Sequence, residues 1–142
     1  MSYVQVWIHS VWGTKNRYPF MDLEKRKTIC EHIKANAKEK QILIDCIDGF
    51  TDHLHCLFLL NADVPLSKHL QLIKGEATNW INKNGLFQMP FGWADDYFAA
   101  SVSRDKLNVV RAYIKNQNNH HQKNTFQEEY DGFLKSFGYY HG

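Results

Sequence analysis

Cysteine is scarce in this chain of 142 residues, which contains only Cys30, Cys46 and Cys56. Their number is odd, and no two of them form a Cys-x-x-Cys pair. Both features argue against a disulfide framework and against a zinc site built from four thiolates. Long hydrophobic runs are also missing. The longest one, from Cys56 to Leu60, is far too short to cross a bilayer.

The start of the chain, MSYVQVWIHS, has no basic region followed by a hydrophobic stretch, so we expect a cytoplasmic protein without a secretory signal. A formal net charge of +2 permits a nucleic-acid partner without requiring one. We find no repeat, linker or low-complexity segment. The length suits one well-buried domain, and we therefore expect a single domain over residues 1–142.

Hydrophobic periodicity and turn residues predict six main elements in the order β-α-β-β-α-β, followed by C-terminal helices. Strands are predicted over 3–12, 41–48, 53–60 and 98–102, with Gly49 as the turn after the second strand. Helices are predicted from the N-cap Asp22 to about Lys40, from Leu66 to near Asn84, after Ser103, and from a capping box at Thr125–Glu128. This order is that of an α+β, ferredoxin-like sandwich with an antiparallel sheet. A right-handed crossover would place the first and third strands at its centre. The fold hosts many activities and does not define one.

Two histidines, His53 and His55, flank Leu54 at the start of the predicted third strand. Side chains alternate along a strand, so both imidazoles point to one face, about 7 Å apart, while Leu54 points toward the core. That face should be the one the two crossover helices leave uncovered, or its rim. Histidine is the commonest metal ligand, yet a lone His-x-His pair is more often structural or exposed. Asp52 precedes the pair and is placed to orient a ligand.

Tyr113 and Gln117 are four residues apart on the predicted third helix and therefore share one helical face. Beside a metal, a glutamine carbonyl oxygen is a usable ligand and a tyrosine hydroxyl is a potential nucleophile. The alternative is that Tyr113 packs at a helix–sheet boundary and Gln117 faces solvent. Without the histidine pair, that alternative would be favoured.

Taken together, the segments DHLHCLF, YIKNQ and IHSVWGTKNRYPF resemble the HUH-type single-tyrosine transposases of small insertion sequences (200/605-like), including their REP-associated relatives. In the HUH motif, U is a bulky apolar residue, here Leu54. The resemblance extends from VWGTKNRYP through LIKGEATNW and FGWADDYFAASVS to Tyr113.

The resemblance implies that His53, His55 and Gln117 bind Mg²⁺ or Mn²⁺ and that Tyr113 is the nucleophile. The implied substrate is single-stranded DNA with hairpins near the element ends, which is cut and rejoined through a 5′-phosphotyrosine intermediate. The family also implies a homodimer in which the tyrosine helix of one subunit can serve the histidines of the other. No membrane partner is implied.

Three basic residues are candidates for contacts with DNA phosphates or with the hairpin: Lys15 and Arg17 in the loop after the first strand, and Lys74 on the second helix. The remaining histidines are expected in ordinary surface or core positions; they are His9, His32, His69, His120 and His121.

Three alternatives remain open. The chain could be a non-catalytic, ferredoxin-like nucleic-acid-binding module in which His53 and His55 are surface residues. It could also be a domesticated HUH nickase that acts on chromosomal repeats. A structural zinc site with His53, His55 and a cysteine is less favoured, because Cys56 points to the opposite face of the strand.

Overall fold

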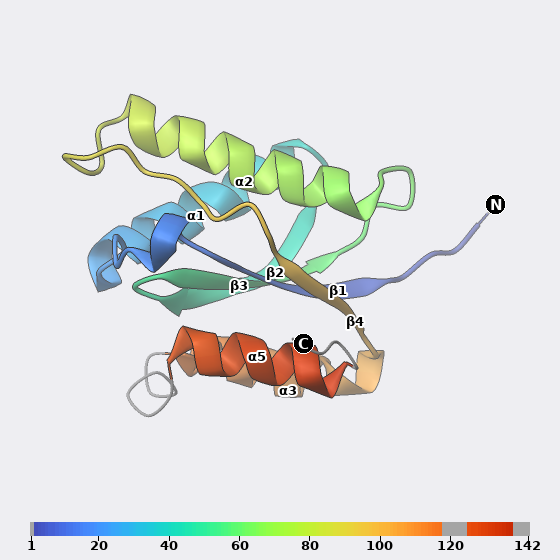
Figure 1. Cartoon of the computed structure of the whole chain (residues 1–142). Helices are drawn as coiled ribbons and strands as arrows, with labels where there is room; N and C mark the ends of the chain where they lie inside the picture. The colour runs from blue at the N-terminus through green and yellow to red at the C-terminus, as the bar shows by residue number, and fades with distance from the viewer. Residues whose placement is uncertain (1, 118–124, 138–142) are drawn as a thin grey trace.

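In a computed structural model that describes residues 2–117 and 125–137, a four-stranded antiparallel sheet lies between helices on both faces (Figure 1). The strands are β1 (Trp7–Gly13), β2 (Leu43–Phe50), β3 (His53–Leu59) and β4 (Phe98–Val102). Their order across the sheet is β2-β3-β1-β4, with β1 and β3 at the centre. The predicted α+β, ferredoxin-like arrangement is therefore confirmed.

The crossover helices α1 (Leu23–Glu39) and α2 (Leu66–Lys83) cover one face of the sheet. The C-terminal helices α3 (Leu107–Lys115) and α5 (Phe126–Ser136) cover the other, as Figure 1 shows. Short 3₁₀ turns, Lys15–Arg17 and Arg104–Lys106, precede α1 and α3. The main hydrophobic core lies under α1 and α2 and includes Leu54 of β3, which is fully buried.

Two helix starts follow the capping residues of the sequence, those of α1 and α5. The Asp22 side chain accepts a hydrogen bond from the Lys25 backbone N–H at 2.9 Å, and the capping box between Thr125 and Glu128 is present. Both caps satisfy N–H groups that the first turn of a helix leaves without partners. These predictions are confirmed.

The first strand is shorter than predicted and begins at Trp7. Opposite Trp7 the two neighbouring strands end, at Leu59 and Val102, so the ladder does not extend back to Tyr3. The predicted turn at Gly49 is also wrong. Gly49 lies within β2, and the turn falls on residues 51–52.

A close backbone contact explains why Gly49 stands in the strand. A Cβ atom at this position would lie 2.1 Å from the backbone oxygen of His53. Only a residue without a side chain allows the two strands to approach this closely, directly beside the first histidine of the pair.

Alternation along β3 separates the histidines from the main core. Leu54, Cys56 and Phe58 pack under α1 and α2, whereas Leu57 packs with Leu107 and Ile114 on the opposite face. His53 and His55 share that opposite face, which the crossover helices leave uncovered, as predicted. Within the described ranges, no helix is both long enough and apolar enough to cross a membrane.

Candidate active site

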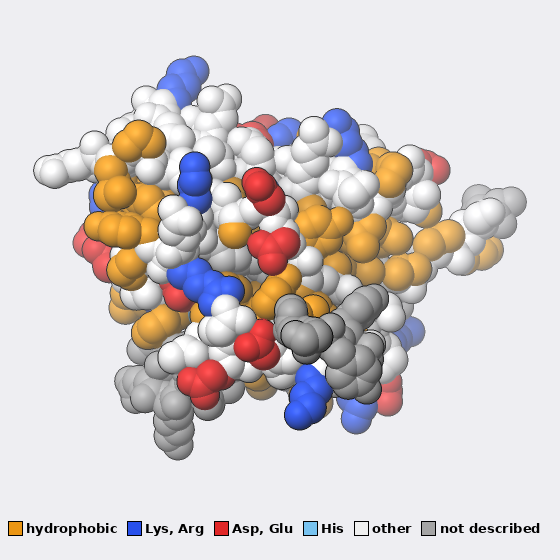
Figure 2. Space-filling view, in the orientation of Figure 1, with side chains coloured by type: hydrophobic (Ala, Val, Ile, Leu, Met, Phe, Trp, Pro, Cys, Tyr) orange, Lys and Arg blue, Asp and Glu red, His pale blue; other side chains and the backbone are white. Residues whose placement is uncertain are grey.

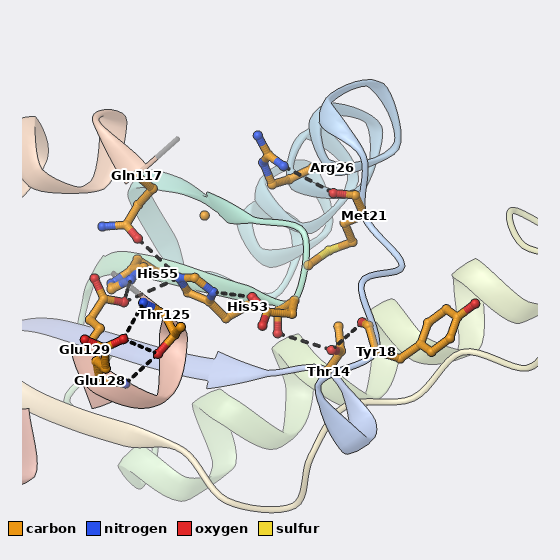
Figure 3. A network of polar contacts seen from close by, with 12 residues as sticks. Thr14, Tyr18, Met21, Arg26, His53, His55, Gln117, Thr125, Glu128 and Glu129 are labelled. Carbon is orange, nitrogen blue, oxygen red and sulfur yellow. Dashed lines mark hydrogen bonds and ion pairs between the residues drawn. The ribbon is translucent and has the colours of Figure 1, made fainter. Parts of the chain in front are cut away.

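The histidine pair lies between the sheet and α5, where both side chains are fully buried (Figure 3). The centroids of the two rings are 5.2 Å apart. Burial contradicts the alternative in which His53 and His55 are surface residues of a non-catalytic module. Cys56 belongs to the core on the other face, so it cannot complete a zinc site with them.

Glu129 of α5 contacts both histidines from the helix that packs over them. Its Oε1 atom lies 2.9 Å from Nε2 of His55 and 3.4 Å from Nε2 of His53. Each of the three residues offers one ligand atom, and these atoms lie within 4.8 Å of one another. Two imidazoles and a carboxylate form a donor set that suits a divalent cation.

Gln117, two residues beyond the end of α3, belongs to the same cluster. Its side chain is fully buried, and its Oε1 atom lies 3.2 Å from Nε2 of His53. Its amide nitrogen donates to the backbone oxygen of Tyr113, which directs the amide oxygen toward the histidines. The alternative of a solvent-facing Gln117 is therefore wrong.

The Tyr113 hydroxyl points at the same carboxylate and donates a hydrogen bond to Oε2 of Glu129. The ring of Tyr113 lies 5.4 Å from that of His55, centroid to centroid. Burial, and then the hydrogen bond to the Glu129 carboxylate, raise the pKa of Tyr113 well above its usual value. The phenol is thus protonated at neutral pH, and it lies beside histidines of its own chain.

The other ring nitrogen of each histidine, Nδ1, has a partner as well. Nδ1 of His53 lies 2.8 Å from Asp52, and Nδ1 of His55 lies 2.9 Å from Nε2 of His9. Burial lowers the pKa of His53, but its hydrogen bonds to Asp52 and Glu129 outweigh this effect, and the net shift is upward. Burial, assisted by the charge of His55, lowers the pKa of His9 to about 3, so His9 is neutral.

Sequence reasoning missed two residues of this cluster, His9 and Glu129. His9 is buried, which agrees with the expected core position, but it also contacts His55 inside the candidate site. Strand alternation places His9 on one face of β1, but the register that sets it beside His55 is not readable from sequence. Glu129 carries no spacing signal at all. His120 and His121 lie outside the described residues.

Two other histidines do have ordinary roles. His32 stacks on Trp80 and contacts Glu76 between α1 and α2. His69 belongs to α2 and is fully buried; its ring contacts the Pro65 backbone oxygen and accepts a hydrogen bond from the Asn61 N–H. Both lie across the sheet from the histidine pair.

Aromatic side chains of α5 close the site. The ring of Phe126 stacks on His53 with centroids 4.2 Å apart and an interplanar angle of 4°. Phe133 packs edge-on against His9, His55 and Tyr113, at centroid distances between 5.8 and 6.1 Å. In this arrangement α5 separates the two histidines from solvent.

The predicted DNA contacts in the first loop follow the end of β1 at which Gly13 pairs with His53. Lys15 and Lys74 line one groove of about 630 Å³, together with Asn16 and Thr78. The Lys74 ammonium also donates to the Ala94 backbone oxygen at 2.9 Å, and burial lowers its pKa. Arg17 is exposed outside this groove, with its guanidinium 5.3 Å from the Phe126 ring. On the face drawn in Figure 2, basic and acidic side chains are interspersed.

Comparison with known proteins gives matches of two kinds. Residues 2–117 match the family model described as "Transposase IS200 like". A protein of Deinococcus radiodurans R1 assigned as a transposase has a similar structure, with a TM-score of 0.66 and 19% identity, covering 82% of this chain and 95% of that one. A REP-associated tyrosine transposase bound to a REP hairpin also has a similar structure, with a TM-score of 0.63 and 14% identity. This match covers 85% of this chain and 72% of that one. Among curated proteins nothing matches.

Proposed function

This chain belongs to the family of IS200-like transposases, and we propose that it cuts and rejoins hairpin-bearing single-stranded DNA through Tyr113. One observation carries the proposal. The Tyr113 hydroxyl and the Nε2 atoms of His53 and His55 all meet at the carboxylate of Glu129. A nucleophile and a candidate metal site are thus combined within one chain.

We propose that His53 and His55 hold Mg²⁺ or Mn²⁺, with Gln117 as the third protein ligand. The amide oxygen of Gln117 and the carboxylate of Glu129 are both oxygen donors at this point, which suits either cation. When bound, the cation supplies positive charge that polarises an oxygen of the scissile phosphate.

Tyr113 would perform the bond exchange. Its phenol oxygen loses its proton and attacks phosphorus, and the bond from phosphorus to the 3′-oxygen breaks. The products are a 5′-phosphate linked to Tyr113 and a free 3′-hydroxyl that has gained a proton. One phosphodiester replaces another, so the reverse attack by a new 3′-hydroxyl can join strands without ATP.

Access to Tyr113 depends on α5. The Glu129 carboxylate lies between the histidine nitrogens and the Tyr113 hydroxyl, which is the position that a scissile phosphate has to take. Because the histidines are fully buried beneath α5, DNA reaches them only after this helix moves from the sheet.

For the DNA contacts, Lys15 and Lys74 are proposed to bind phosphates along their common groove, and Arg17 to bind one beside it. The hairpin in the complex of the REP-associated relative supports a hairpin ligand for this fold. We also propose a homodimer, which the family resemblance implies. Because Tyr113 lies beside the histidines of its own chain, we propose that each subunit uses its own Tyr113.

The test is a covalent adduct with hairpin-bearing single-stranded DNA, followed on a denaturing gel with and without Mn²⁺ or Mg²⁺. The wild type and Tyr130→Phe, the matched tyrosine of α5, should form the adduct. Tyr113→Phe should form none. His53→Ala should also form none while binding the hairpin nearly as well as the wild type, because phosphate contacts elsewhere dominate affinity. An equal adduct yield from Tyr113→Phe would disprove the proposal.

A further inference from the structure

His9, a buried histidine outside the proposed ligand set, supports the ring of His55 from the side away from Glu129. Its Nε2 atom lies 2.9 Å from Nδ1 of His55, and the two rings stack with centroids 5.2 Å apart at 23°. His9 is 8% exposed and His55 is fully buried, so the contact is shielded from solvent.

A histidine that binds a cation through Nε2 carries its ring proton on Nδ1. Such ligands almost always donate that proton to a neighbouring acceptor, which fixes both the tautomer and the orientation of the ring. Asp52 is the acceptor placed at Nδ1 of His53. At Nδ1 of His55, the corresponding group is the imidazole of His9.

The sheet and α5 hold His9 in this position. His9 pairs with Leu57 in the ladder between β1 and β3, and Val11 pairs with His55, so the two histidines are diagonal neighbours on one face. Phe133 of α5 lies edge-on against His9, with centroids 5.8 Å apart. The backbone pairing and this aromatic contact restrict the imidazole to the side of His55.

We propose that His9 is a positioning residue that accepts a hydrogen bond from Nδ1–H of His55 and so directs the unprotonated Nε2 of His55 toward the cation. The proposal rests on the metal site of the proposed function. It assigns His9 no contact with the cation or with DNA.

The test compares Mn²⁺ affinities measured by isothermal titration calorimetry on the full chain. His9→Phe keeps a ring that can stack but has no acceptor, and it should bind Mn²⁺ about 10–100-fold more weakly than the wild type. His9→Gln places an amide oxygen near the position of Nε2 and should restore most of the affinity. His9→Asn, one methylene shorter, should bind as weakly as His9→Phe.

The matched control is His69→Phe, which removes a buried, hydrogen-bonded histidine across the sheet. It should lower the melting temperature and leave the Mn²⁺ affinity unchanged. The melting temperature of each variant shows whether a loss of Mn²⁺ affinity comes from loss of the fold or from loss of the acceptor. If His9→Phe does not fold, the comparison of Mn²⁺ affinity between His9→Gln and His9→Asn tests the proposal.

Two results would overturn the inference alone: a wild-type affinity in a folded His9→Phe, or equal affinities of His9→Gln and His9→Asn. A wild type that binds no Mn²⁺, or an unchanged affinity in His53→Ala, would overturn the proposed metal site and this inference with it.

Discussion

Both histidines of β3 have partners at each ring nitrogen. The Nδ1 atoms face Asp52 and His9, and the Nε2 atoms face Glu129. A buried hydrogen bond contributes about 1 kcal/mol, and leaving a buried group without its partner costs more, so neither ring can turn freely. The direction of both candidate ligands is thus set by the protein before a cation binds.

At the residue scale, Gly49→Ala tests how closely the strands approach beside His53. The added Cβ would lie 2.1 Å from the His53 backbone oxygen, and backbone cannot yield as a flexible side chain can. We expect the free energy of unfolding in urea to fall by more than about 2 kcal/mol. Gly75→Ala is the control: nothing lies within 4 Å of its Cβ, and alanine should add up to about 1 kcal/mol in helix α2. A Gly49→Ala protein as stable as the wild type would refute this explanation.

At the scale of elements, α3 is attached to the edge strand β2 by a two-point ion pair. Nε and Nη2 of Arg111 each donate to one oxygen of Asp45 at 2.8 Å. Leu107 and Ile114 pack beside this pair against Leu57. The ion pair and the apolar contacts together hold the helix that carries Tyr113.

The ion pair gives a pH-dependent prediction. The hydrogen bond from Arg111, and then the arginine charge, hold the pKa of Asp45 below its usual value of 3.8. A lowered pKa in the folded state stabilises the protein above the unfolded pKa, and this contribution fades as pH falls through the folded value. Asp45→Asn should therefore lower the melting temperature by a few degrees at neutral pH, a modest effect because the pair is partly exposed. The difference from the wild type should shrink below about pH 4. A difference that grows in acid would contradict the assignment.

The position of α5 gives a second prediction at this scale. Phe126 and Phe133 supply its aromatic contacts with the site. Replacing both by alanine weakens the packing of α5 on the sheet, and we expect adduct formation on hairpin DNA to become several-fold faster. Phe137→Ala is the control, because this ring is 55% exposed and packs on Phe98. Slower adduct formation by the double variant would show that α5 is part of the productive site.

Local signals explain which parts of this structure the sequence predicts. Asp22 and Thr125 mark helix starts because a cap acts within three residues, and the alternation around Leu54 sets the face of the histidine pair. The contacts of His55 with His9 and Glu129 join positions 46 and 74 residues apart. They depend on the register of β1 against β3 and on the packing of α5, for which no local pattern exists.

At the scale of the whole molecule, one chain supplies every residue of the candidate site. His9 comes from β1, the histidine pair from β3, Tyr113 from α3 and Glu129 from α5. Tyr113 contacts Glu129, which contacts both histidines, so no second copy is needed to bring the proposed nucleophile to the histidines.

Mixing two inactive variants tests this arrangement. If each subunit uses its own tyrosine, equal amounts of Tyr113→Phe and His53→Ala should form no more adduct than either protein alone. Sedimentation velocity on the same mixture establishes whether the two chains associate. Adduct formation by a mixed dimer would mean that Tyr113 acts on the histidines of its partner.

The central claim, that Tyr113 becomes covalently linked to DNA, is tested most directly by peptide mapping of the adduct. After incubation with hairpin-bearing single-stranded DNA and Mn²⁺, nuclease and protease digestion followed by mass spectrometry should identify a 5′-linked nucleotide on the peptide that contains Tyr113. The same peptide should be unmodified when Mn²⁺ is omitted. A nucleotide on any other residue, or no linked peptide from a folded protein that binds the hairpin and the cation, would contradict the account.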